Sequence, residues 1–247
     1  MNLSLPWINT LVLISIRLST VLLFSPIQAI RLAPIHARVL LVFIFALVFI
    51  NYLPTPETSS SLFLGALLEC ANGIILSASL YACFAVFQIA GQIIDNQIGF
   101  NSIVLFNPAA HSQESLSSRL LSMLAVLLFF GVDGHLWLFK GLNHSFMLIP
   151  PGSLKLFSGF TPVIKQFVFM FSMAFMIASP IVLILLAIDL ACALITRTMP
   201  QLSTYFLSLP IKIILGLVVL HLILNNFEKD SITVFRHCFE TWQELLS

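Results

Sequence analysis

A run of 25 residues without a charge, Cys70–Ile94, is the feature that most limits how this chain can fold. As an α-helix rising ~1.5 Å per residue, the run would be ~37 Å long. A bilayer's hydrocarbon core is only ~30 Å thick. The run is also rich in alanine, glycine and serine, and small residues let helices approach closely. We therefore expect a long helix that contacts other helices more than lipid.

The composition of the whole chain indicates the protein class. Of its 247 residues, 59% are hydrophobic and 9% are charged. A single aqueous core cannot bury so much apolar surface, so the chain is predicted to be an all-α integral membrane protein surrounded by lipid. The net charge of +1 includes no basic block, which excludes nucleic acid as a partner on electrostatic grounds.

About six apolar helices with kinks are predicted, of which the third begins near Leu62 and contains the uncharged run. The other five are Leu5–Phe24, Val39–Leu53, Leu120–Phe139, Gln166–Ile188 and Leu202–Phe227. The first has no Lys or Arg before its apolar core, so we expect a retained helix and no signal peptide. Ser179-Pro180 predicts a kink or two half-helices within the fifth.

Residues 1–227 are expected to form one membrane domain, and residues 228–247 an amphipathic C-terminal tail. Apolar residues recur through the tail at helical spacing, which predicts a surface or partner-binding helix. They are Ile232, Phe235, Phe239, Trp242 and Leu246.

The segment Gly91–Pro108 interrupts the apolar pattern near the middle of the chain. Asp95, Asn96 and Gln97 are followed by Gly99 and then by a short apolar stretch that ends at Asn107-Pro108. The apolar residues are Phe100, Ile103, Val104, Leu105 and Phe106. Too short to cross a bilayer, the stretch is typical of a re-entrant or cavity-lining loop that closes a pore. The alternative is a bent helix pair whose apolar residues simply pack.

Several charged residues lie inside the predicted helices. A buried arginine is costly in hydrocarbon, so Arg17 should find an acceptor, with Glu69 as the first choice. The alternative is that Arg17 snorkels to an interface. Asp189 and Arg197 lie two helical turns apart, which is too far for a simple pair, and each should meet a different partner. Lys212 also stands where a lipid-facing helix would avoid a charge.

Candidate sites for chemistry are few. Asp133 and His135 suggest a proton relay, or else a hydrogen-bonded cap or turn beside Gly131 and Gly134. The four cysteines show no CxxC spacing, which favours buried, inert thiols. The six histidines form no metal-binding pair, so neither a metal nor another cofactor is expected. No residue set indicates an enzyme.

Charge bias does not orient the six predicted spans. With Arg17 left aside, the two sides carry five basic residues each, so the positive-inside rule has no preference. The side shared by both termini holds Lys140, Lys155, Lys165, Lys229 and Arg236, and the other holds Arg31, Arg38, Arg119, Arg197 and Lys212. Either these spans are wrong or the helices do not cross as ordinary hairpins.

Short motifs in a characteristic order support a resemblance over nearly the whole chain. They are Arg17 with Pro26, PIHAR at 34–38, AGQII at 90–94, Gly99, Asn107-Pro108, GHLWL at 134–138, Ser179-Pro180, Ile188-Asp189, RTMPQLS at 197–203 and Pro210. In these features the chain resembles the FliR family of flagellar biosynthetic proteins, equivalent to the T subunit of the type III secretion export apparatus.

The resemblance implies a non-enzymatic core subunit of an export gate in the bacterial inner membrane, within a flagellar basal body or an injectisome base. Such a subunit would assemble with the P and Q subunits into a closed helical ring that unfolded exported proteins traverse, and the B/U switch subunit would be a further partner. Its helices would form tilted hairpins lifted largely above the bilayer plane. The loop at Phe100–Phe106 would be an apolar plug.

The chain also departs from the family pattern. Gln92 replaces an acid that is common in the family, Asp189 stands where Asn is usual, and Ala193 replaces a typical Gly. Ser102 occupies a position where an aromatic plug residue is expected. The plug function is therefore assigned to the loop, and a gate of this kind excludes water and ions by apolar contact. Gln92, Asp95 and the internal charges are assigned to structure and assembly.

A small secondary transporter or ion channel is the alternative function. Its polar pathway would use Arg17, Glu69, Asp95 and Asp189, because intramembrane charges commonly mark such pathways. A transporter should show paired halves with matching broken helices, and the sequence contains no such repeat. An intramembrane hydrolase is a third possibility that lacks a recognisable Ser, His and Asp set.

Overall fold

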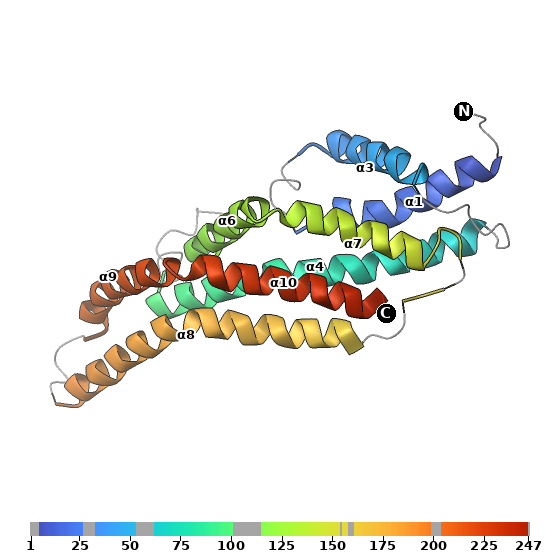
Figure 1. Cartoon of the computed structure of the whole chain (residues 1–247). Coiled ribbons are helices and arrows are strands. Elements are labelled where there is room, and N and C mark those ends of the chain that lie inside the picture. Colours follow the sequence, from blue (N-terminus) through green and yellow to red (C-terminus); the bar gives the residue numbers. More distant parts are fainter. Residues whose placement is uncertain are drawn as a thin grey trace. The chain divides into compact units, whose positions relative to one another are not determined.

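The computed structural model describes residues 5–26, 33–52, 62–100, 115–153, 155–157, 161–198 and 204–246. All regular structure within these ranges is helical (Figure 1). The helices are α1 (Leu5–Leu23), α3 (Ile35–Ile50), α4 (Leu62–Ile98), α6 (Leu116–Gly131), α7 (Gly134–Leu148), α8 (Thr161–Thr198), α9 (Thr204–Leu224) and α10 (Phe227–Leu246). The predicted class, an all-α membrane protein, is confirmed.

The chain forms two compact units. The first comprises Met1–Phe84, Phe129–Val168 and Phe235–Ser247, and the second comprises Ala85–Leu128 and Phe169–Val234. Four helices, α4, α6, α8 and α10, have residues in both units. Each unit therefore builds its core from segments that lie far apart in the sequence.

The first unit has a core of aliphatic and aromatic side chains. Phe84 of α4 makes ring contacts with Phe129 and Phe235, at centroid distances of 5.4 and 5.6 Å. Helix α1 packs against α3, and its residues Ile14 and Leu18 are fully buried. The aromatic cluster joins the end of α6 and the middle of α10 to α4, so the unit is held by contacts between distant segments.

The second unit also has an apolar core. Phe87 of α4 packs edge-on against Phe227 of α10, with centroids 5.3 Å apart. Ile98, at the end of α4, lies so close to Gly216 of α9 that an added Cβ would come within 2.6 Å of Ile98 Cγ1. The absence of a side chain at Gly216 thus permits the close approach of α4 and α9.

Helix α4 extends past the uncharged run and includes Asp95, Asn96 and Gln97. It continues to Ile98 and ends at Gly99, which has a left-handed φ of 91°. The backbone N–H groups of Gly99 and Phe100 both donate to the Asp95 carbonyl. A left-handed glycine is a common C-cap, so Gly99, rather than the polar triplet, terminates the helix.

Helix α8 continues through Pro180 as a single helix. Its axis bends near the middle (Figure 1), as expected where proline removes a backbone hydrogen bond and its ring crowds the preceding turn. The kink predicted from Ser179-Pro180 is therefore present, whereas a division into two half-helices is not.

Fewer helices of the described residues are long and apolar enough to cross a membrane than the six apolar segments that were predicted. Among the described residues, only α4 and α8 are single helices that are long and apolar enough to cross a membrane. Two bent pairs would raise the number to four: α6 with α7, bent by 72°, and α9 with α10, bent by 62°. Helices α1 and α3 are shorter. Length and composition therefore allow two to four crossings among the described residues, fewer than the six ordinary crossings considered from the sequence.

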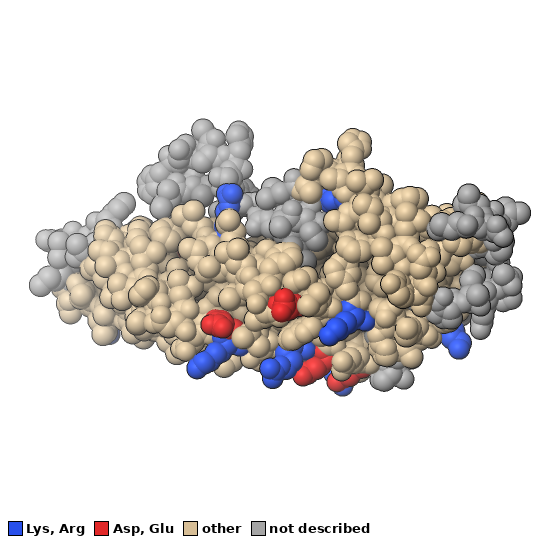
Figure 2. Space-filling model, turned by 45° about the horizontal axis from the view of Figure 1, so that its top comes forward, with Lys and Arg blue, Asp and Glu red and all other residues tan. Residues whose placement is uncertain are grey.

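The two long helices differ in how far the chain buries them. In the most apolar 18-residue stretch of each helix, 61% of the α4 residues are buried, compared with only 28% of the α8 residues. This confirms that α4 mainly contacts other helices. Helix α8 instead presents large exposed side chains such as Phe175 and Leu183, and Figure 2 shows wide areas of one face without charged residues. The exposed apolar side chains of α8 require lipid or partner proteins to cover them.

Candidate functional site

A buried ion pair joins α1 to α4 in the first unit. Arg17 Nε donates to Glu69 Oε2 at 2.5 Å, and both side chains are almost completely buried, at 0% and 1% exposure. The partner predicted for Arg17 is thus correct, and the snorkelling alternative is wrong. Because an unpaired charge is very costly in an apolar interior, each residue depends on the other.

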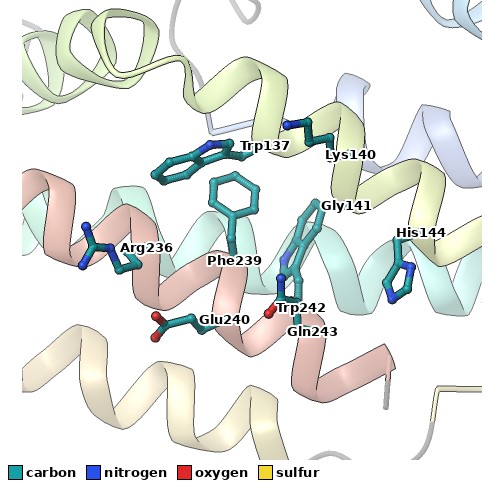
Figure 3. A pocket seen from close by; sticks show the side chains of 9 residues that line it. All are labelled: Trp137, Lys140, Gly141, His144, Arg236, Phe239, Glu240, Trp242 and Gln243. Carbon is teal, nitrogen blue, oxygen red and sulfur yellow. The ribbon is translucent and has the colours of Figure 1, made fainter.

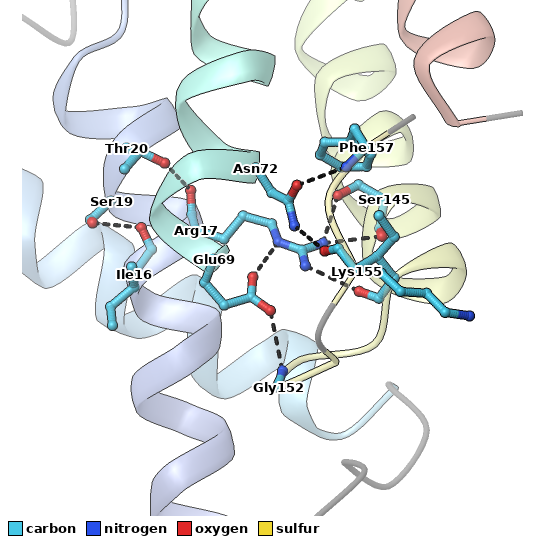
Figure 4. A network of polar contacts seen from close by, with 11 residues as sticks. Ile16, Arg17, Ser19, Thr20, Glu69, Asn72, Ser145, Gly152, Lys155 and Phe157 are labelled. Carbon is cyan, nitrogen blue, oxygen red and sulfur yellow. Dashed lines mark hydrogen bonds and ion pairs between the residues drawn. The ribbon is translucent and has the colours of Figure 1, made fainter. Parts of the chain in front are cut away.

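Arg17 also binds the C-terminal end of α7. Its guanidinium donates to the Ser145 carbonyl and hydroxyl oxygens at 3.1 and 2.9 Å, and to the Ile149 carbonyl at 3.1 Å (Figure 4). It also lies 4.4 Å from the ring centroid of Phe146. The last carbonyls of a helix have no partner within the helix and carry partial negative charge. Arg17 therefore caps α7 from another helix.

The turn that follows α7 is held by two residues of α4. Glu69 Oε1 accepts a hydrogen bond from the Gly152 N–H at 3.2 Å. Asn72 donates to the Lys155 carbonyl and accepts from the Phe157 N–H, both at 3.1 Å (Figure 4). Gly152 has a left-handed φ of 84°, a conformation that glycine adopts readily. Glu69 and Asn72, one helical turn apart, thus fix the chain after α7.

Asp95 performs a similar function in the second unit, at the start of α6. Its Oδ2 accepts from the Ser117 N–H at 2.9 Å and from the Ser115 hydroxyl. Ser115 in turn accepts from the Ser118 N–H, which is the usual geometry of a serine N-cap. A carboxylate at a helix N-terminus also interacts favourably with the helix dipole. Asp95, fully buried, therefore fixes α6 to α4.

The glycine before this site allows the two helices to touch. A Cβ on Gly91 would lie 2.7 Å from the Ser117 carbonyl carbon and would also collide with the Ser118 backbone. Ser118 Oγ donates to the Gln88 carbonyl at 3.0 Å. The AGQII motif, whose function the sequence did not reveal, therefore contains the contact surface for α6. Gln92 within it is exposed.

A third polar contact in the second unit joins α8 to α9. Lys212 forms an ion pair with Asp189 Oδ1, and Gln97 donates to Asp189 Oδ2 at 3.4 Å. Arg197 is exposed near the end of α8, and its expected separate partner stays a prediction. The pairing of Asp189 with Lys212 was missed, since the sequence offered no signal linking the two helices.

The four residues of the hypothetical transport pathway do not form one cluster. Arg17 and Glu69 pair in the first unit, whereas Asp95 and Asp189 lie in the second. Asp95 binds the N-terminus of α6, and Asp189 binds Lys212. In the described part of the chain, each of these charges is engaged with a local structural partner.

Most of the predicted plug lies outside the described residues. Ile103, Val104, Leu105 and Phe106 fall in residues 101–114. Phe100 is described and is partly buried directly after α4. The loop therefore leaves α4 at the Gly99 cap and re-enters the described chain at Ser115, beside Asp95.

The Asp133-Gly134-His135 sequence forms the corner between α6 and α7. Asp133 has a left-handed φ of 57°, and its carbonyl accepts from the Leu136 N–H at 2.9 Å. A Cβ on Gly134 would lie 2.6 Å from Phe129 Cε2, so the corner is tightly packed. These features agree with the turn interpretation of the motif.

The described residues contain no group of three or more His, Cys, Asp or Glu side chains that could hold a metal ion. Cys83 and Cys238 are buried, and Cys70 and Cys192 are partly exposed. Cys238 lies 3.7 Å from the Ser79 carbonyl oxygen, so this thiol belongs to a helix contact within the first unit.

Sequence reasoning did not reveal a groove between α7 and α10. Trp137 of α7 and Phe239 of α10 line it, together with charged side chains from both helices (Figure 3). Trp242, predicted to belong to a partner-binding face, is 1% exposed and packs against Gly141 of α7. Much of the apolar side of α10 is thus covered by the chain itself.

Comparisons with known proteins agree with the resemblance. The family described as bacterial export proteins, family 1, matches residues 8–238. The chain is 29% identical to flagellar biosynthetic protein FliR of Bacillus subtilis, over 95% of this chain and 93% of that protein. Identity is 27% to FliR of Escherichia coli, over 98% and 95%. It is 30% to Yop proteins translocation protein T of Yersinia pestis, over 58% and 56%. The chain belongs to family 1 of the bacterial export proteins.

Proposed function

We propose that this chain is a structural subunit of the export gate of a flagellar-type, or type III, secretion apparatus. In this proposal it lies in the bacterial inner membrane and helps form the channel through which unfolded proteins leave. It has no catalytic function. The names of its relatives, a flagellar biosynthetic protein and a Yop translocation protein, support this class of apparatus.

One observation carries the structural interpretation: the charges inside the apolar helices bind neighbouring helices. Arg17 and Glu69 cap and fasten α7, and Asp95 caps α6. Asp189 pairs with Lys212. A residue that carries protons or solute must release one partner and take another. Side chains that cap helix ends or form buried ion pairs are better suited to keep the helices in fixed positions.

The exposed apolar faces support assembly with other proteins. Helices α8 and α9 expose large side chains such as Leu190 and Ile214. We propose that the P and Q subunits cover part of this surface, that the B/U switch subunit also contacts the complex, and that lipid covers the remainder. Arg197, exposed at the end of α8, is assigned to one of these subunit contacts, as is Gln92.

The segment Phe100–Phe106 is proposed to plug the channel. It begins directly after the Gly99 cap, and the chain resumes at Ser115, where Asp95 fixes the start of α6. Both ends of the loop are thereby attached to the end of α4. An apolar segment held in this way excludes water and ions from a passage without any catalytic group.

A secretion assay tests the proposed function. A strain that lacks its own export-family subunit is complemented with this chain, and exported proteins in the medium are quantified. We expect secretion to depend on the chain, and the tagged chain to purify with two small, equally apolar proteins. A chain that restores no secretion, purifies as a folded monomer and transports a solute in liposomes would support the transporter alternative instead.

A further inference from the structure

The groove between α7 and α10, within the first unit, has no function in the proposal above. Its volume is about 850 Å³. Trp137 of α7 and Phe239 of α10 lie near one another at its centre (Figure 3). Their ring centroids are 5.7 Å apart at an interplanar angle of 84°. Two of the three tryptophans of the chain, Trp137 and Trp242, line this one groove.

The aromatic side chains are held in place by close packing. Phe239 and Trp242 make an edge-on contact with centroids 5.6 Å apart. A Cβ on Gly141 would lie 2.5 Å from Trp242 Cε3, so the indole rests directly on the backbone of α7. The groove therefore has a rigid apolar wall contributed by both helices.

The charged residues of the groove are unbalanced. Lys140 of α7 and Arg236 of α10 are both exposed, and Glu240 is the acidic residue among those that line the groove. Neither cation forms an ion pair with another described residue. Their cationic groups lie on either side of Trp137 and Phe239 in Figure 3. The groove thus offers two cations on separate helices around an aromatic centre.

The groove also includes a polar group that lacks a partner. Trp242 is 1% exposed, and its Nε1–H has no acceptor among the described residues. A buried donor without an acceptor is costly. The Nε1 atom is itself buried, so this donor belongs to the wall of the groove and not to the surface that a ligand would contact.

We propose that this groove binds the headgroup region of an acidic phospholipid. The chain is a membrane protein, so phospholipid is a ligand that it can meet. Tryptophan is enriched at the membrane interface, and basic pockets between helices bind anionic headgroups. Lys140 and Arg236 would contact the phosphate, and Trp137 and Phe239 would contact the glycerol and the first carbons of the acyl chains.

Native mass spectrometry of the purified full-length chain, with any subunits that accompany it, tests this proposal. Phosphatidylglycerol and phosphatidylcholine are titrated separately into neutral detergent, and the fraction of lipid-bound protein is measured. We expect phosphatidylglycerol to bind more tightly. Lys140→Gln and Arg236→Gln should each weaken its binding about fivefold, since a basic residue near an anionic membrane contributes about that factor. The double variant should lose more.

Two further variants complete the test. Lys229→Gln removes one charge from an exposed site on α10 outside the groove, so it should leave lipid binding unchanged. Glu240→Gln removes the groove's acidic residue and should strengthen phosphatidylglycerol binding, a gain that misfolding cannot produce. Unchanged binding in the double variant and in Glu240→Gln would overturn the proposal. So would a double variant that retains lipid but loses a co-purifying protein, because the groove would then be a protein-docking site.

Discussion

Arg17 and Glu69 are 52 positions apart in the sequence, yet their side chains form a buried ion pair of 2.5 Å. The pair joins α1 to α4. Through Ser145 and Gly152 it also holds the end of α7 and the turn that follows. A single contact thus fixes the relative positions of three segments within the first unit.

Removal of one partner from this pair should strongly destabilise the protein. We expect Glu69→Gln or Arg17→Gln to lower the free energy of unfolding by about 3–5 kcal/mol, because the remaining charge is left buried and unpaired. The double variant should lose less free energy of unfolding than the two single variants lose in total. Thermal unfolding in detergent measures both effects.

The exposed pair of Lys165 and Glu244 provides the control. Its atoms are 3.9 Å apart, and the side chains are 67% and 59% exposed. Lys165→Gln should therefore change stability by less than about 1 kcal/mol. Equal unfolding temperatures for Glu69→Gln and Lys165→Gln would contradict the structural importance of the buried pair.

Gly91 should tolerate no side chain. Gly91→Ala would force the backbone of α6 away from α4, at a cost of about 1–3 kcal/mol for overpacking, and would disturb the Asp95 cap. Gly131→Ala is a matched control, since no atom lies within 4 Å of the added Cβ. The yield of folded protein on size-exclusion chromatography distinguishes the two variants, and an intact Gly91→Ala protein would show that the contact is dispensable.

The ion pair of Asp189 and Lys212 should form again when the two residues are exchanged for one another. Asp189→Lys or Lys212→Asp alone places like charges together, and each should reduce the yield of assembled complex on a native gel. The exchanged double variant should recover most of it. Because the Asp189 side chain is 40% exposed, the stability change is expected to be only about 1 kcal/mol or less. Failure of the exchange to recover any yield would mean that another contact controls assembly.

Thiol reactivity should follow burial. In the isolated folded chain, maleimide should label Cys70 and Cys192, which are partly exposed, before Cys83 and Cys238, which are buried. Denaturation should make all four react. Mass spectrometry of peptides after timed labelling checks this order, and rapid labelling of Cys238 would show that α10 does not remain packed as described.

The sequence predicted the fold class and the Arg17–Glu69 pair because charges in long apolar runs require a partner. It also predicted the kink at Pro180 and the corner at Asp133. It did not identify the partner of Asp95. The residue binds the N-terminus of a helix that begins more than 20 residues later, and local pattern carries no information on such a contact.

The remaining polar contacts were beyond prediction for the same reason. Lys212 and Asp189 lie on different helices, and nothing in their spacing indicates that the helices touch. The groove beside Trp242 depends on how α7 and α10 approach at Gly141. The tail pattern at Phe235 and Trp242 correctly predicted a helix. It could not reveal that this apolar side packs on the chain itself.

Ion conductance of the purified complex tests the proposed gate most directly. The complex containing the intact chain and the complex with residues 100–106 deleted are reconstituted into planar bilayers in equal amounts. We predict that the deletion leaves the complex assembled but markedly raises its conductance to small ions. Assembled complexes with the same low conductance would contradict the assignment of this loop as the plug.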